Sequence, residues 1–259
     1  MFLQDWTANE IATYNLANYL SCFVAPGCCS GGGESAEKEE AALTEEHPNG
    51  YLAVPKSGQG PGVLVLHAWW GLNETTRAYC DRLANSGFVV FAPDLYHGQV
   101  TDDIAEAEKL ARSLDSEADV ARTEIQRAAE FLVERSKLSD GRLAVIGFSL
   151  GAFYALDVSA RLPETVSSVV VYYGTGPADF STSRAVYLGH FAENDPYEPS
   201  ENVQWVKSSL SDRGRSFTFH IYPGTGHWFA ESDRADAHNQ AAAELAWERT
   251  LAFLKRTEN

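Results

Sequence analysis

The chain has 259 residues, of which 44% are hydrophobic, and its formal net charge is −16. This length and composition suit one globular domain with a sizeable core. The negative charge argues against nucleic acid and anionic membrane surfaces as partners, because both would be repelled. The sequence contains no run of 18 apolar residues, so we expect no membrane-spanning helix. No Cys-x-x-Cys pair and no His/Cys spacing typical of a metal site occurs in the sequence.

Residues 1–46 differ in composition from the rest of the chain. They contain eight acidic residues and one basic residue, so −7 of the net charge lies there. The glycine-rich and acidic stretch at 30–40 is typical of a flexible linker. We expect an N-terminal extension over 1–46, poorly ordered or locally docked, in a cytoplasmic protein. The alternative is an exported or lipid-anchored protein whose signal contains Cys28, although such a signal normally begins with basic residues.

From residue 47 onward, segments typical of strands and of helices alternate. Continuous apolar runs rich in β-branched residues predict strands that are buried on both faces. These runs lie at 63–67, 88–92, 143–148, 169–173, 185–191 and 217–222. The alternation predicts an α/β fold, with a doubly wound, mostly parallel sheet and helices on both of its faces.

Two of the helices can be placed from their apolar pattern. The segment 117–136 carries one apolar stripe at helical spacing, and Ser-Glu-Ala-Asp at 116–119 is interpreted as its capping box. A last helix is expected over 233–256.

Residues 147–151 read Gly-Phe-Ser-Leu-Gly, between a predicted strand and a predicted helix. In that context G-x-S-x-G is typical of a sharp turn that presents a nucleophilic serine, here Ser149. The glycines are expected because a side chain at either position would crowd the turn. The N-terminus of the following helix would direct free N–H groups at the same place. The alternative is a serine that only caps the helix.

Asp195 and His227 each follow a later predicted strand. The order Ser, Asp, His is that of the triad in α/β-hydrolases. Since the carboxyl ends of parallel strands meet at one edge of a sheet, we expect both residues beside Ser149. His227 would take the serine proton, and Asp195 would hold its tautomer and stabilise the imidazolium. The alternatives are a turn-forming aspartate, a loop histidine, and Glu193 as the acid.

The segment 67–73 ends the first long strand and contains two adjacent tryptophans. The backbone N–H groups of Trp69 and Leu150 are expected to form an oxyanion hole. His67 is interpreted as a hydrogen-bonded structural histidine. Aromatic residues at strand ends favour the apolar wall of a pocket, although core packing is the alternative for Trp70. The residues expected to line the substrate pocket are Trp70, Tyr96, Phe148 and Trp228.

Five segments in order make the chain resemble the dienelactone hydrolase family over about residues 47–256. They are 67–73, 92–96, 147–152, 172–174 and 224–230. The resemblance implies that 47–259 is an α/β-hydrolase catalytic domain without a metal or an organic cofactor. It also implies hydrolysis of small esters or lactones.

Three positions depart from that family together. Ser149 stands where the family usually has a cysteine, Ala68 where it often has a glutamate, and Glu231 where it often has an arginine. The combined change indicates an ordinary serine triad. No basic residue occurs between Tyr96 and Lys109 to bind a substrate carboxylate. This absence, with the net charge, favours uncharged substrates.

The hypothesis from the sequence is a serine carboxylesterase that hydrolyses small uncharged esters or lactones through an acyl-enzyme. One alternative is a carboxymethylenebutenolidase with a serine nucleophile. Another is a non-catalytic binding module with the α/β-hydrolase fold. The sequence leaves the physiological substrate, the acyl-chain preference, the enantioselectivity and the oligomeric state undetermined.

Overall fold

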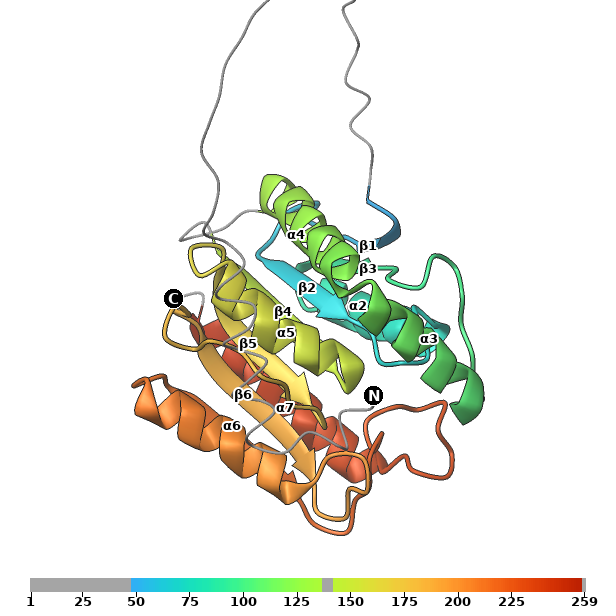
Figure 1. The fold of residues 1–259 in the computed structure, drawn as a ribbon. Helices are drawn as coiled ribbons and strands as arrows, with labels where there is room; N and C mark the ends of the chain where they lie inside the picture. The colour runs from blue at the N-terminus through green and yellow to red at the C-terminus, as the bar shows by residue number, and fades with distance from the viewer. Residues whose placement is uncertain (1–47, 137–141, 258–259) are drawn as a thin grey trace, which may run out of the picture.

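The computed structural model describes residues 48–136 and 142–257. The extension expected over 1–46 therefore lies outside the described residues. The described residues form a seven-stranded sheet in the order β1-β3-β2-β4-β5-β6-β7 (Figure 1). Its strands are β1 (Gly50–Ala53), β2 (Gly62–Leu66), β3 (Val89–Pro93), β4 (Leu143–Phe148), β5 (Val166–Tyr172), β6 (Val186–Ala192) and β7 (Phe217–Tyr222).

The pairing of the strands confirms the mostly parallel sheet. Five of the six neighbouring pairs are parallel, and only β1 runs antiparallel to β3. Each of the six predicted strands is present, and its ends lie within three residues of the expected bounds. Strand β1 is not among the predicted strands. This strand has four residues, of which three are only half-buried, so it carries no continuous apolar run.

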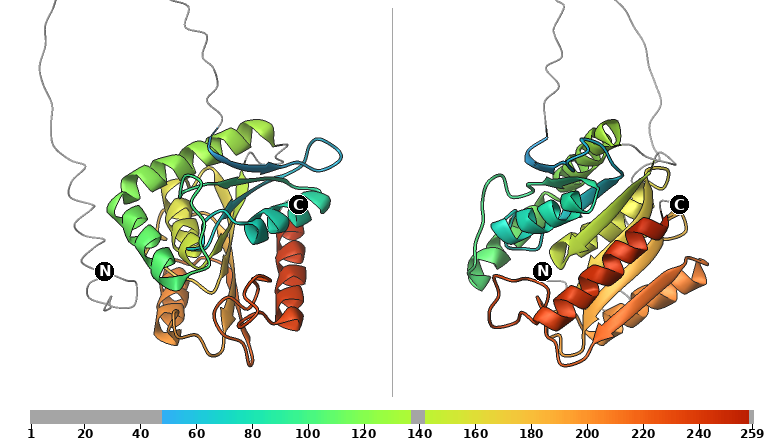
Figure 2. Two further views of the ribbon diagram at one scale, coloured as in Figure 1. Left: turned by 90° about the vertical axis from the view of Figure 1, so that its right-hand side faces the viewer. Right: turned by 180° about the vertical axis from the view of Figure 1, so that it is seen from behind.

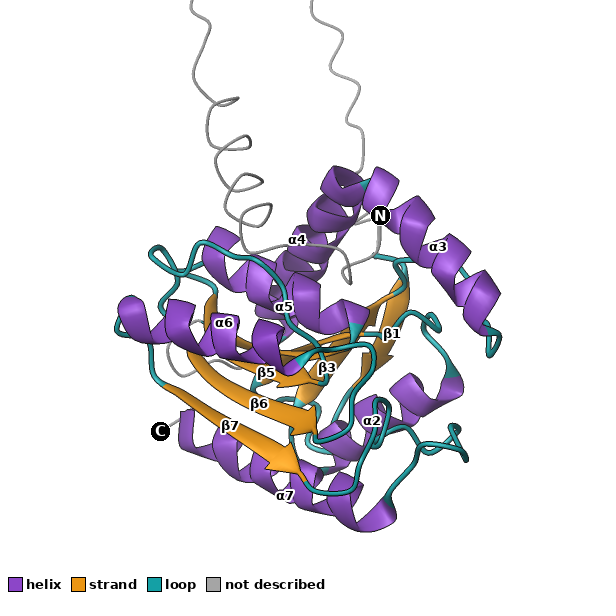
Figure 3. Cartoon of the chain, turned by 60° about the horizontal axis from the view of Figure 1, so that its bottom comes forward, coloured by secondary structure: helices purple, strands orange, loops and turns teal. Residues whose placement is uncertain are grey.

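Helices cover both faces of the sheet, as expected (Figures 2 and 3). One face carries α4 (Ala118–Arg135), α5 (Leu150–Arg161) and α6 (Ser200–Asp212), with α3 (Ile104–Ser116) packed beside α4. The other face carries α2 (Glu74–Asn85) and α7 (Gln240–Thr257). None of the described helices is long and apolar enough to cross a bilayer.

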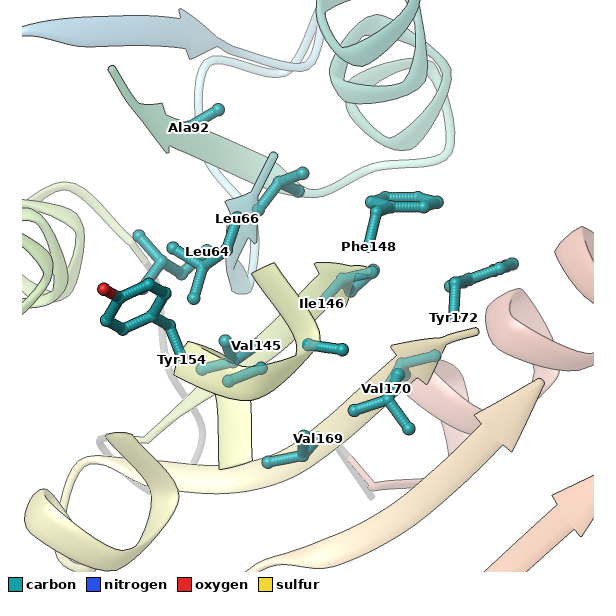
Figure 4. Close-up of a cluster of buried hydrophobic side chains, with 14 of the residues drawn as sticks. Leu64, Leu66, Ala92, Val145, Ile146, Phe148, Tyr154, Val169, Val170 and Tyr172 are labelled. Carbon is teal, nitrogen blue, oxygen red and sulfur yellow. The ribbon is translucent and has the colours of Figure 1, made fainter. Parts of the chain in front are cut away.

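The central strands explain the continuous apolar runs in the sequence. Every residue of β2, β3 and β4 is buried, because helices cover the sheet on both sides. Figure 4 shows side chains of β2, β4 and β5, among them Leu64, Ile146 and Val170, gathered in this core near α5. On α4 the predicted apolar stripe is buried, as Ala121, Ile125 and Leu132 illustrate.

Two local predictions about helix ends were wrong. Ser116 is the last residue of α3, and Glu117 precedes α4 without a side-chain cap bond, so no capping box forms there. The last helix begins at Gln240, seven residues later than expected. Asn239 explains that start, because its Oδ1 accepts a hydrogen bond from the Ala242 N–H, as a cap does.

The strand order also places the functional loops. The order along the sheet reverses between β2 and β4, which are hydrogen-bonded neighbours. Ligands of such sheets bind beyond the carboxyl ends of the strands at this reversal. The loop after β2 and the turn after β4 therefore begin side by side, and the loops after β5, β6 and β7 follow along the same edge.

Candidate active site

Ser149 occupies a strained turn between β4 and α5. Its backbone angles, φ 48° and ψ −111°, lie in a region that residues other than glycine rarely adopt. A Cβ atom at Gly147 would collide with the carbonyl group of Gly151, and one at Gly151 would collide with the carbonyl oxygen of Leu66. The two glycines thus allow the turn to close and α5 to start against the end of β2.

Hydrogen bonds join the three residues expected to form a triad. Ser149 Oγ lies 2.9 Å from His227 Nε2. On the other side of the ring, Nδ1 lies 2.8 Å from Asp195 Oδ2 and 2.9 Å from Oδ1. The side chains of His227 and Asp195 are both about 5% exposed. This network assigns the proton to Nδ1 and leaves Nε2 free to accept the serine proton.

Backbone groups hold the Asp195 carboxylate in place. Its Oδ1 accepts hydrogen bonds from the N–H groups of Tyr197 and Glu198, each at 2.9 Å. Glu193, the other candidate for the acid, is exposed and accepts a hydrogen bond from the Gly224 N–H instead. The carboxylate in contact with His227 is therefore that of Asp195.

The backbone near the expected oxyanion hole comes from two elements. Leu150 is the first residue of α5, so its N–H has no acceptor within the helix. Trp69 lies in the loop after β2, three residues beyond Leu66. Because the start of α5 packs on the end of β2 at Gly151, both residues lie at one corner of the site.

Three tryptophans and a tyrosine form an aromatic wall beside His227. The Trp228 ring lies 5.3 Å from that of Trp70 and 5.9 Å from that of Trp69, between ring centroids. Tyr197 packs on Trp228 at 4.7 Å and on His227 at 5.2 Å. The structure thus brings the predicted residues Trp70 and Trp228 together at the triad. Tyr197 was missed, because a lone tyrosine after Asp-Pro carries no pocket signal in the sequence.

The other two predicted pocket residues, Phe148 and Tyr96, make different ring contacts. Phe148 stacks on Tyr172 at 4.6 Å and meets Tyr79 of α2 edge-on at 5.0 Å. Tyr96 is buried, and its ring meets His67 edge-on at 5.0 Å. Within the described part of the chain, no ring contact joins Phe148 or Tyr96 to the tryptophans. The structure therefore does not gather them into the aromatic wall.

His67 lies in the core with both ring nitrogens in hydrogen-bond contact. Nε2 accepts from the Leu95 N–H at 3.3 Å, and Nδ1 lies 2.7 Å from the Ala68 carbonyl oxygen, to which it donates. Burial lowers the pKa of His67 from its usual value. The ring is thus a neutral group that links the loops after β2 and β3, as the sequence suggested.

Tyr173 and Glu231 are further functional candidates, and neither was among the predicted site residues. The Tyr173 ring lies 5.0 Å from the His227 ring, and its hydroxyl donates a 2.8 Å hydrogen bond to Glu231 Oε1. Both residues are buried. Burial raises the pKa of Glu231 to about 8. The signal available beforehand was the Tyr-Tyr-Gly end of a strand, together with a glutamate four residues after His227.

A basic side chain also adjoins the aromatic wall. The Arg234 guanidinium lies 4.2 Å from the Trp70 ring centroid and 5.2 Å from that of Trp228. Its Nη1 donates to the Asp102 carbonyl oxygen at 3.0 Å. Arg234 belongs to the loop before α7 and so lies outside the segment between Tyr96 and Lys109, in which the sequence has no basic residue. Within residues 48–136 and 142–257, no group of three or more metal-ligating side chains is arranged to hold a metal ion.

Comparison with known proteins agrees with this fold. A family model described as "Dienelactone hydrolase family" matches residues 49–258. The chain is 30% identical to Protein usf of Aquifex pyrophilus, over 80% of this chain and 92% of that protein. It is 31% identical to Carboxymethylenebutenolidase 1 of Cupriavidus pinatubonensis, over 79% and 89% of the two chains. A dienelactone hydrolase-like promiscuous phosphotriesterase from metagenomic libraries shares the fold. It has a TM-score of 0.70 and 20% identity, over 79% of this chain and 89% of that one.

Proposed function

This chain belongs to the dienelactone hydrolase family, and we propose that it is a serine carboxylesterase acting on small uncharged esters or lactones. The observation that carries the proposal is the line of hydrogen bonds from Ser149 through His227 to Asp195. A serine hydroxyl is a weak nucleophile until a base removes its proton, and this line supplies the base and its orienting acid.

Acylation begins when Ser149 Oγ attacks the ester carbonyl. His227 Nε2 takes the hydroxyl proton as the bond forms, and the backbone N–H groups of Leu150 and Trp69 donate hydrogen bonds to the oxyanion. The imidazolium then gives the proton to the leaving alkoxide. An alcohol, or the ring-opened end of a lactone, is released and the acyl group stays on Ser149.

Deacylation repeats the same steps with water. His227 removes a proton from a water molecule that attacks the acyl-enzyme, and it returns that proton to Ser149 Oγ as the acid leaves. Asp195 stays ionised throughout and stabilises the imidazolium. Neither half-reaction needs a metal or an organic cofactor, and the partner that we propose is a small-molecule ester or lactone substrate.

The preference for uncharged substrates rests on the surroundings of the triad. The aromatic wall places the buried rings of Trp69, Trp70 and Trp228 and the half-buried Tyr197 beside the triad, and such apolar surroundings solvate a carboxylate poorly. The net charge of −16 also repels anions as they approach.

Arg234 supports a second candidate, a carboxymethylenebutenolidase. Its guanidinium lies over Trp70 and Trp228 and could pair with the carboxylate of an anionic lactone. The Cupriavidus relative carries that name. A non-catalytic binding module is the third reading, and the complete set of hydrogen-bonded triad residues speaks against it.

One experiment separates the three. Ring opening is followed for a dienelactone carboxylate and for its methyl ester, which differ in charge, beside p-nitrophenyl esters of increasing acyl length. The esterase is expected to give the higher kcat/KM with the uncharged compounds. A preference for the carboxylate that is lost in Arg234→Gln would establish the second candidate. No turnover, with no covalent labelling of Ser149 by a phosphonate, would establish the third.

A further inference from the structure

Tyr173 lies between the two halves of the triad. Its ring packs on His227 with 5.0 Å between ring centroids. The next residue, Gly174, is so close to the backbone of Ser149 that a Cβ atom there would collide with it. A change in the position of Tyr173 would therefore move both the turn at Ser149 and the ring of His227.

The backbone of Tyr173 is strained. Its φ is 36°, in the left-handed region that a bulky aromatic residue rarely adopts. Such strain persists only where the surroundings hold the residue in place, and it is most often found at functional sites. Two hydrogen bonds hold Tyr173: its N–H donates to the His190 carbonyl oxygen at 2.8 Å, and its hydroxyl donates to Glu231 at 2.8 Å.

Glu231 approaches Tyr173 from the loop that also carries His227. The two residues lie four positions apart, and both contact the same tyrosine, one at the ring and one at the hydroxyl. The loop after β7 thus contacts the Tyr173 side chain at two points, its ring and its hydroxyl. This arrangement ties the position of the imidazole to the hydrogen bond at the far end of the tyrosine.

The charged and titratable groups around Glu231 are few. Tyr173 faces it from the end of β5, and Asp233 and Arg234 face it from its own loop, while Trp70 comes from the loop after β2 without a charge. The Asp233 carboxylate raises the pKa of Glu231 and the Arg234 guanidinium lowers it, but burial is the largest cause and raises it to about 8. At neutral pH the carboxyl group is therefore mostly protonated and still accepts the hydrogen bond from Tyr173.

We propose that Glu231 is a positioning residue for the base, which holds the Tyr173 hydroxyl so that the tyrosine ring supports His227 at Ser149. The inference rests on the proposed function, because it assigns His227 the role of base. Glu231 does not touch the substrate in this role, and it needs an acceptor oxygen rather than a charge. Glutamine supplies that oxygen at nearly the same size, so Glu231→Gln is the conservative variant and Glu231→Leu the disruptive one.

The test measures kcat and KM with a neutral p-nitrophenyl ester, per active site titrated with a phosphonate. Tyr173→Phe and Glu231→Leu are expected to lower kcat about ten- to hundredfold, the effect of a misplaced catalytic group, with KM within about twofold. Glu231→Gln should stay within about threefold of the wild type. The double variant Tyr173→Phe/Glu231→Leu should be no slower than either single variant, since each breaks the same hydrogen bond.

Tyr187→Phe is the matched control. Tyr187 is also a buried tyrosine, and its hydroxyl bonds Ser159 and Ser183 away from the triad. Its loss should lower the thermal midpoint about as much as Tyr173→Phe does and leave kcat unchanged. A kcat for Tyr173→Phe and Glu231→Leu within about twofold of the wild type would overturn the inference. Tyr173→Phe tests it even where Glu231→Leu does not fold.

The pH profile gives a second readout, which a purely structural role would not change. Profiles of kcat/KM for the wild type and Glu231→Gln should coincide below pH 7 and separate above about pH 8, where only the wild type gains a buried charge. Profiles that differ equally at pH 6 and pH 9 would show that Glu231 acts as an anion and would overturn the inference. A wild type with neither turnover nor phosphonate labelling would instead reject the proposed function.

Discussion

Ser149 Oγ and His227 Nε2 lie 2.9 Å apart although 78 residues separate them along the chain. The strands that carry them, β4 and β7, are not neighbours in the sheet, since β5 and β6 lie between them. Three strand spacings amount to about 14 Å. The loop after β7 therefore reaches back along the edge of the sheet. Its contacts with Tyr173 and the tryptophans determine the position of the His227 imidazole.

Replacing the nucleophile tests the centre of the mechanism. Ser149→Ala should lower ester hydrolysis by about 10⁴- to 10⁶-fold, as removal of a triad residue does, and abolish phosphonate labelling. The thermal midpoint should not fall, because the variant removes one oxygen from a strained turn. If the purified variant kept more than about a tenth of the wild-type kcat, another residue would have to be the nucleophile.

The acid of the triad can be tested against its nearest competitor. Asp195→Asn should leave the fold intact and lower kcat by about 10⁴-fold, because an amide favours the wrong imidazole tautomer. Glu193→Gln is the matched control, since Glu193 is exposed and bonds the Gly224 N–H. It should retain nearly full activity in the same ester assay. The reverse ranking of the two variants would show that the acid is Glu193.

Burial of Glu231 predicts how stability depends on pH. Burial raises its pKa in the folded state to about 8, from the ordinary value of 4.5. Between these values the folded protein holds a proton that the unfolded chain has lost. The contribution of this group to the free energy of unfolding is therefore fully present below about pH 4.5. It is lost as the pH rises through about 8, at up to about 1.4 kcal/mol per pH unit.

Glu231→Gln removes that ionisation. Thermal or urea unfolding at intervals from pH 5 to 9 should show the variant gaining stability relative to the wild type as the pH rises. Parallel stability curves for the two proteins would mean that Glu231 ionises normally in the folded state.

The glycine at the start of α5 should not accept a side chain. Gly151→Ala would drive a methyl group into the Leu66 carbonyl oxygen, which is backbone and cannot move freely. We expect a loss of about 1–3 kcal/mol in unfolding free energy and of most esterase activity. Gly214→Ala is the control: nothing lies within 4 Å of its Cβ, and only its φ of +65° is unfavourable, at about 1 kcal/mol. Equal effects on activity would refute this account of the turn.

Deletion of residues 1–46 should leave a folded, active hydrolase. The alternating strand and helix pattern predicted from residue 47 onward and all three triad residues lie outside that segment. Thermal unfolding and ester turnover of the truncated protein, beside the full chain, provide the test. An aggregating or inactive truncation would show that the segment belongs to the domain.

The parts of this protein that could be predicted from the sequence are those with a local cause. Strands such as β4 can be predicted from continuous apolar runs, because both of their faces are buried. The turn at Ser149 can be predicted because a side chain at either of its two glycines would collide with nearby backbone. The parallel sheet then brings Asp195 and His227 to the same edge as Ser149, since each follows a strand in it.

The remaining features depend on contacts between distant segments, which leave no periodic pattern. Phe148 and Tyr96 were predicted as pocket residues, and their ring contacts with Tyr172 and His67 could not be read from the sequence, because a strand pattern does not define which rings meet. The start of α7 depended on one Asn239 side chain. Tyr173 and Glu231 acquire their relation to His227 only when the loop after β7 folds back, because burial and hydrogen bonding there come from three separate elements.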